Sequence, residues 1–221
     1  MVAVVALLVG SYLLGAFPQV YLLGRLWGVD LRREADLHIA LWRQVSPVPG
    51  FIGIVGDMAK GVIPILVIRG LGMDPWVAAL AGLLAVAGQM WPAYLFSTGG
   101  RGNTTGVAMA LTLAPSTFLI SSIPMWLGAI IRTLPRFIKA RQFASGPPSR
   151  SFPLGIIGGF ALMPAVAWWQ AEAGAIVLAY AGLFLVIVVR RLSVGLRADF
   201  KVANNKRSLF WNRFLYDRSF L

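Results

Sequence analysis

The chain has 221 residues, of which 58% are hydrophobic and 13% are charged, and its mean hydropathy is +0.75. Soluble domains are about 45–50% apolar and about 25% charged, so this composition excludes an ordinary soluble fold and predicts a protein embedded in lipid. There is no cysteine and one histidine, which excludes disulfides and a cysteine nucleophile and predicts neither a metal site nor a cofactor.

The apolar stretches follow one another along the chain at lengths that suit a bilayer. The uninterrupted spans predicted in chain order are 2–27, 50–68, 76–92, 152–169 and 173–189. The stretch 104–131 contains Pro115 and Pro124, and proline removes a backbone donor and clashes one turn back. We therefore expect two spans there, joined by a tight turn near Pro115. The sequence predicts an all-α polytopic membrane protein with about seven transmembrane helices.

The net charge of +12 would suggest nucleic acid in a soluble protein. Here the basic residues fall in short segments between apolar stretches, which predicts cytoplasmic loops near anionic membrane lipids and no nucleic-acid partner. With the N-terminus outside, the cations of 25–43, 132–150 and 190–218 fall inside, and only Arg69 falls outside. A single crossing over 104–131 would put the cations of 132–150 outside, which the positive-inside rule disfavours. We expect a multi-pass protein of the cell membrane with a cytoplasmic C-terminus.

The C-terminal tail, 198–221, interleaves aromatic and basic residues. This mixture is typical of a segment that lies along the inner leaflet, and docking onto a partner protein is the alternative. The expected organisation is a transmembrane domain over 1–197 and a basic aromatic tail over 198–221.

A glycine-rich stretch at 96–106 is the most informative polar segment. Glycines around a guanidinium let backbone N–H groups converge, and the N-terminus of the following helix is a natural phosphate site. The alternative is a flexible turn with an N-cap at Asn103. The candidate phosphate-binding residues in this stretch are Gly99, Gly100, Arg101, Gly102, Asn103 and Thr104.

Asp57 and Lys60 lie inside a predicted span, three residues apart, so they share a helix face and can pair. Charges within a span are costly and usually face a protein interior or a wet cavity. The functional interpretation is a polar cavity below the inner surface, with Lys60 reaching toward an anion; the alternative is a buried ion pair that fixes helix packing. His38 is expected to be a loop residue, because no second metal ligand accompanies it.

At these residues the chain resembles the bacterial acyl-phosphate:glycerol-3-phosphate acyltransferase family. That family carries D-x-R near the end of its first helix, then an arginine, a glycine seven residues later, and D-x-x-K-G in the second helix. It also carries G-H-x-x-P followed by F-x-G-G-K-G-V-A-T. The matching positions here are Asp30, Arg32, Arg43, Gly50, Asp57-Met-Ala-Lys60-Gly61, Gly88-Gln-Met-Trp-Pro92 and 96–107.

The resemblance implies an active site on the cytoplasmic side and transfer of a fatty acyl group from acyl phosphate to glycerol 3-phosphate, giving lysophosphatidic acid. It adds Arg32, Arg43 and Lys60 to the phosphate-binding residues of the glycine-rich stretch. Asp30, Asp57 and Gln89 are expected to support them.

The sequence departs from the family pattern where protons would be handled. Segment 34–42 lacks the serine, asparagines and glycines of the family loop, Gln89 stands for the motif histidine, and Arg101 stands for the lysine. The cations survive, whereas general acid–base groups are missing. Two hypotheses follow: a divergent acyltransferase, or a catalytically inactive descendant that serves as a structural or lipid-binding subunit of a larger membrane complex. A small transporter ranks last, because no inverted repeat is visible.

Overall fold

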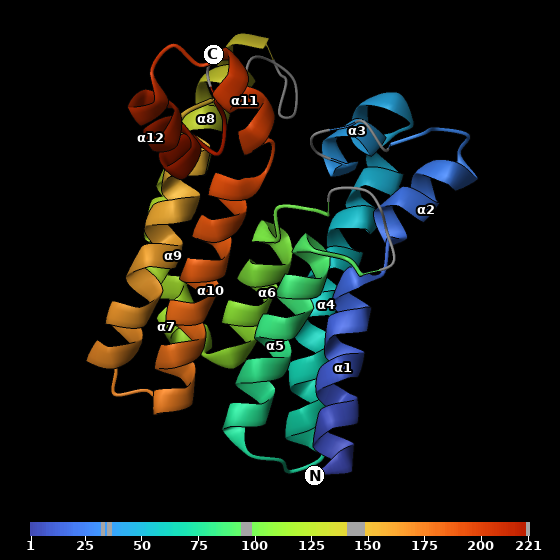
Figure 1. The fold of residues 1–221 in the computed structure, drawn as a ribbon, viewed down its shortest axis with the longest axis vertical. Helices are drawn as coiled ribbons and strands as arrows, with labels where there is room; N and C mark the ends of the chain where they lie inside the picture. Colours follow the sequence, from blue (N-terminus) through green and yellow to red (C-terminus); the bar gives the residue numbers. More distant parts are fainter. Residues whose placement is uncertain (32–33, 35–36, 94–98, 141–148, 220–221) are drawn as a thin grey trace. The chain divides into compact units, whose positions relative to one another are not determined.

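The protein is described from a computed structural model that covers residues 1–221, with 32–33, 35–36, 94–98, 141–148 and 220–221 left undescribed (Figure 1). Every element in the described part of the chain is a helix. The helices form two compact units, Met1–Pro115 and Ser116–Leu221.

The first unit is arranged around one long central helix. Its helices are α1 (Val2–Ala16), α2 (Gln19–Leu26), α3 (Leu37–Gln44), α4 (Pro47–Gly70), α5 (Pro75–Met90) and α6 (Asn103–Leu113). Helix α4 contacts all five of the others, and α1 packs along α5 (Figure 1). The chain bends between α1 and α2 at Pro18, which lacks the N–H that would continue the helix. Any side chain that points inward from α4 is therefore within reach of several elements.

Helices α4 and α6 approach closely because of a glycine. A Cβ atom at Gly61 would lie 2.3 Å from the backbone oxygen of Thr105, so only glycine fits at this crossing. Small residues allow such close backbone approach between membrane helices. The contact brings the first turn of α6 beside the middle of α4.

The second unit contains α8 (Ile123–Ala140), α9 (Ser151–Trp169), α10 (Gly174–Ser193), α11 (Leu196–Val202), α12 (Lys206–Tyr216) and most of α7 (Pro115–Ser121). The tail helix α12 packs on α9 and α10. Two buried arginines hold α12 in place through hydrogen bonds and an ion pair. Arg191 donates to the backbone oxygens of Phe214, at 3.0 Å, and of Pro153, at 3.1 Å, and Arg213 pairs with Asp199.

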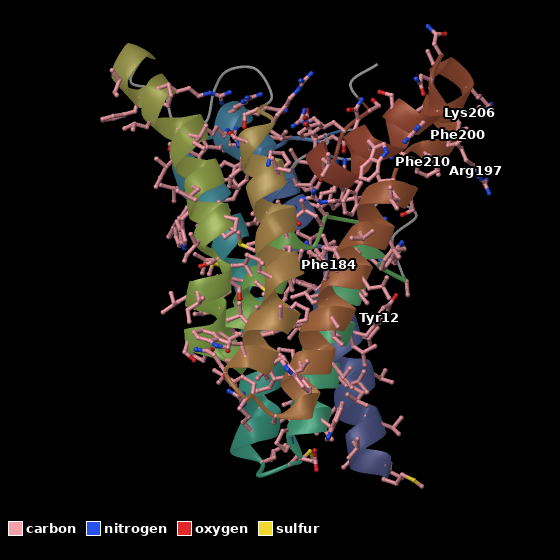
Figure 2. The ribbon with its side chains drawn as sticks, turned by 90° about the vertical axis from the view of Figure 1, so that its left-hand side faces the viewer. Tyr12, Phe184, Arg197, Phe200, Lys206 and Phe210 are labelled. Carbon is pink, nitrogen blue, oxygen red and sulfur yellow. The ribbon has the colours of Figure 1, made fainter. Side chains whose placement is uncertain are left out.

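Aromatic and basic side chains gather at the same end of the second unit, where Arg197, Phe200, Lys206 and Phe210 lie (Figure 2). The Lys206 ammonium lies 5.6 Å from the centre of the Phe200 ring, and the Phe200 and Phe210 rings meet edge to face with centroids 5.6 Å apart. Such contacts favour a lysine close to an aromatic face. The interleaved tail is thus folded into helices within this unit.

Four helical stretches in the described chain are long and apolar enough to cross a membrane: Val2–Leu26, Pro47–Gly70, Ser151–Trp169 and Gly174–Ser193. A further pair, Pro115–Ser121 and Ile123–Ile138, is bent by 48°. The expected break near Pro115 is present, because α6 ends at Leu113 and α7 begins at Pro115. The all-α fold is confirmed. The count of about seven spans and the orientation stay predictions.

Candidate functional site

The centre of the site is the Asp57 carboxylate, which is 1% exposed in the middle of α4. Its Oδ1 accepts from Lys60 Nζ at 2.8 Å and from Gln19 Nε2 at 3.2 Å. Its Oδ2 accepts from His38 Nε2 at 2.8 Å and from Gln89 Nε2 at 2.9 Å. Donors from four helices, α2, α3, α4 and α5, therefore meet on one carboxylate.

Lys60 and Gln89 close a ring with Asp57. Lys60 lies one turn after Asp57 on α4, so the two side chains share a face, and its Nζ also donates to Gln89 Oε1 at 2.7 Å. The Gln89 amide thus accepts from the cation and donates to the anion. A buried ion pair is tolerated only when further hydrogen bonds satisfy both partners, and this ring provides them.

The first turn of α6 is fixed to the same part of α4. Thr105 Oγ1 donates to the backbone oxygen of Asp57 at 3.0 Å. Helix α6 begins after Gly102, which caps it with a left-handed backbone at φ 73°, a conformation that glycine adopts at little cost. The cap is therefore Gly102, and the N-cap expected at Asn103 is wrong. Asn103 is the first helical residue, and its buried Oδ1 has no partner within the described chain.

A pocket opens beside the Asp57 network. The Gly100 N–H donates to the backbone oxygen of Gln89 at 2.9 Å, which holds Gly100 against the end of α5. The polar lining residues are Gln19, Tyr21, Glu34, Asp57, Lys60 and Gln89, with the glycines Gly99 and Gly100 beside them. The Lys60 ammonium and the amide and backbone groups of this lining can bind an anion, and the carboxylates of Glu34 and Asp57 lie in the same lining.

The structure places the candidate residues from the sequence in two groups. Asp57, Lys60, Gln89, Gly99 and Gly100 come together at the pocket. The remaining described candidates, outside that lining, are Asp30, Arg43, Arg101, Gly102, Asn103 and Thr104. Arg32 lies outside the described residues. The expected pairing of Asp57 with Lys60 is present. The binding roles of all these residues stay predictions.

Two residues at the site were missed by sequence reasoning, Gln19 and His38. His38 is not a loop residue, because it belongs to α3, and its ring contacts Asp57. Gly53 makes room for it: a Cβ atom there would lie 3.3 Å from His38 Cδ2. The available signals were a polar residue directly after Pro18 in an apolar run, and a histidine among apolar neighbours close to a span with a buried acid.

Comparison with known proteins gives one consistent result. The glycerol-3-phosphate acyltransferase family matches residues 5–195. A relative named glycerol-3-phosphate acyltransferase 4, from Dehalococcoides mccartyi strain CBDB1, is 30% identical over 94% of this chain and 86% of its own length. Glycerol-3-phosphate acyltransferase 5, from another strain of that species, is 31% identical over 95% of this chain and 86% of its own.

Two crystal structures share the fold. Both are of PlsY (YgiH), an integral membrane glycerol 3-phosphate acyltransferase, in its lysophosphatidic acid and glycerol 3-phosphate forms. Their TM-scores are 0.68 and 0.69, with 21% and 23% sequence identity, and each alignment covers 90% of this chain and 93% of the other.

Proposed function

The chain belongs to the glycerol-3-phosphate acyltransferase family, and we propose that it transfers a fatty acyl group from acyl phosphate to glycerol 3-phosphate. The products are lysophosphatidic acid and inorganic phosphate. The chain is a multi-pass membrane protein, so an acyl donor dissolved in lipid has direct access to it. The single observation that carries the proposal is Lys60, a buried cation that is held by Asp57 and Gln89 and lines a polar pocket.

Lys60 is suited to bind a phosphate because one of its donors remains. An ammonium has three N–H groups, and two of them are used by Asp57 Oδ1 and Gln89 Oε1. Within the described chain the third N–H has no protein acceptor, and the side chain lines the pocket. A charge-assisted bond to a phosphate oxygen contributes about 1.5–3 kcal/mol. Lys60 would therefore contribute to the affinity for a phosphorylated substrate.

The other cations and the glycine-rich loop supply the rest of the proposed anion site. Gly99 and Gly100 line the pocket with backbone, and the N-terminus of α6, from Asn103, presents N–H groups of the kind that bind phosphate. Arg32, Arg43 and Arg101 are proposed as further phosphate-binding residues because their charges suit two phosphorylated substrates.

The inactive-descendant alternative is not favoured. The relatives that match nearly the whole chain are named as acyltransferases, and the buried charges are arranged around a pocket. A partner complex for this chain stays a prediction.

The proposal is tested by incubating the purified protein with an acyl phosphate and labelled glycerol 3-phosphate. We expect lysophosphatidic acid well above a no-protein control. Lys60→Met should lower kcat/KM for glycerol 3-phosphate by about 10–150-fold, the equivalent of one charge-assisted bond. Lys201→Met, which removes an exposed lysine of α11, is the matched control and should leave the rate unchanged. No product above the control would refute the proposal.

A further inference from the structure

Helices α11 and α12 follow the residues that the family matches, which end at 195. The proposed acyl transfer assigns no role to either helix. One face of α12 is buried through Leu209 and Arg213, where the helix packs on α9 and α10. The opposite face is exposed, and its composition indicates what it contacts.

This outer face of α12 combines cations with large aromatic rings. Arg207 and Trp211 lie one turn apart on it, with Lys206 and Phe210 beside them. Trp211 is 54% exposed and Phe210 is 41% exposed, and every fully exposed charged side chain in 206–219 is a cation. Exposed aromatic rings grouped with charges of one sign are typical of an interaction surface.

The position of α12 along the spans is fixed by Arg191, near the C-terminal end of α10. Its guanidinium donates to the backbone oxygen of Phe214 in α12, at 3.0 Å, and to that of Pro153 in the first turn of α9, at 3.1 Å. Helices α9 and α10 are both long and apolar enough to cross a membrane. Helix α12 is therefore held at the level where two spans end.

The length of α9 places that level at a membrane surface. Its 19 residues extend about 28 Å, which is close to the thickness of about 30 Å of the hydrocarbon core. Trp168 and Trp169 are exposed at its far end, and tryptophan is enriched at both interfaces of a bilayer. If these two residues mark one interface, the first turn of α9 and the attached α12 lie at the other.

We propose that the outer face of α12 binds the headgroups of anionic phospholipids in the leaflet at this end of the second unit. Lys206 and Arg207 pair with the lipid phosphates, and Trp211 and Phe210 lie among the headgroups, as aromatic side chains do at a bilayer surface. Lipid is favoured over a protein partner because the ends of the spans hold the face at the level of the headgroups. The aromatic and basic residues gathered at this end of the unit can be followed in Figure 2.

The experiment uses the full chain, which contains no cysteine. Ser208→Cys, at an exposed position of α12, accepts a single bimane label, and the protein is reconstituted in bilayers of phosphatidylcholine and phosphatidylglycerol. Quenching of bimane by brominated forms of each lipid gives the ratio of their binding constants at this face. We expect phosphatidylglycerol to be preferred about 5–30-fold, because each of the two cations contributes about fivefold near an anionic surface. The preference should fall toward one in 1 M salt, where the Debye length is about 3 Å.

Two variants of the labelled protein separate charge from structure. Lys206→Gln/Arg207→Gln should lower the preference to near one, whereas Lys206→Arg/Arg207→Lys keeps both charges and should preserve it. Equal quenching by the two lipids, or a preference that persists in the glutamine variant, would overturn the inference. A label that neither lipid quenches would place the face in water or against a protein, which also overturns it. Acyl transfer is not measured, so these outcomes leave the proposed function in place.

Discussion

The substitution Asp57→Asn tests whether the buried network holds the first unit together. It removes one negative charge and changes no volume, and it leaves the Lys60 side chain, 5% exposed, without its counter-charge. The new amide also has only one accepting oxygen. Whichever way it is oriented, two of the four donors now face an N–H group.

The expected cost follows from these losses. Removing one partner of a buried ion pair costs about 3–5 kcal/mol, because the other charge stays buried. For a chain of this size, each kcal/mol shifts Tm by about 2–4 °C, so Asp57→Asn should lower Tm by roughly 6–20 °C. The double variant Asp57→Asn/Lys60→Met removes both charges. The double variant should be less destabilised than the two single variants added together, with a coupling energy between the two substitutions on the order of 2 kcal/mol.

The assay is thermal unfolding of the purified protein in detergent, followed by tryptophan fluorescence and by loss of the monodisperse peak in size-exclusion chromatography. Asp74→Asn is the matched control: this exposed residue caps α5 by accepting from the Trp76 N–H at 2.8 Å, and asparagine caps equally well. The reasoning is refuted if the free energy of unfolding of Asp57→Asn lies within about 1 kcal/mol of that of the control. It is also refuted if the destabilisation of the double variant equals the sum of the destabilisations of Asp57→Asn and Lys60→Met.

Two further predictions concern packing in each unit. Gly61→Ala places a methyl group 2.3 Å from the Thr105 backbone oxygen and should lower the free energy of unfolding by about 1–3 kcal/mol. Gly10→Ala on α1, where nothing lies within 4 Å, is the control and should be neutral or stabilising in the same thermal-unfolding assay. Equal effects of the two variants would contradict the close approach of α4 and α6. Arg213→Met removes a buried guanidinium that pairs with an acid of α11 and should make α12 cleavable by trypsin under native conditions. Arg207→Met, at an exposed position of the same helix, should not, and equal protection of both variants would show that Arg213 does not hold the tail.

Much of the fold could be predicted from the sequence, because the signals are local. A run of apolar residues predicts a lipid-embedded helix, and Pro115 marks a break that the structure places between Leu113 and Pro115. The packing of the tail could not be predicted. Its aromatic and basic composition suits both an inner-leaflet surface and a protein partner, and the deciding contacts are backbone carbonyls that Arg191 reaches. Carbonyls are present at every residue, so no sequence pattern marks these as its partners.

The site, like the fold, could be predicted only where the signal is local in the sequence. Asp57 and Lys60 were predicted as a pair because helical spacing alone places them together. Gln89 was expected at the site only through the family resemblance, since its contacts depend on how α5 packs against α4. Residues 99–104 were all expected to bind phosphate, but of these described residues only Gly99 and Gly100 line the pocket. Helix α6 begins directly after Gly102, and the rest of the stretch continues into that helix.

His38 and Gln19 were missed because the hydrogen-bond donors that a buried carboxylate requires were not sought in the sequence. A buried carboxylate has about four acceptor sites, and an unsatisfied one costs about 1–3 kcal/mol or more. Lys60 fills one site of Asp57, so the sequence already implied that donors must arrive from other elements. Polar side chains in apolar surroundings near the ends of the predicted spans are the residues able to supply them, and Gln19 and His38 are two of these. Asking which donors satisfy each buried charge would thus have placed both side chains beside Asp57.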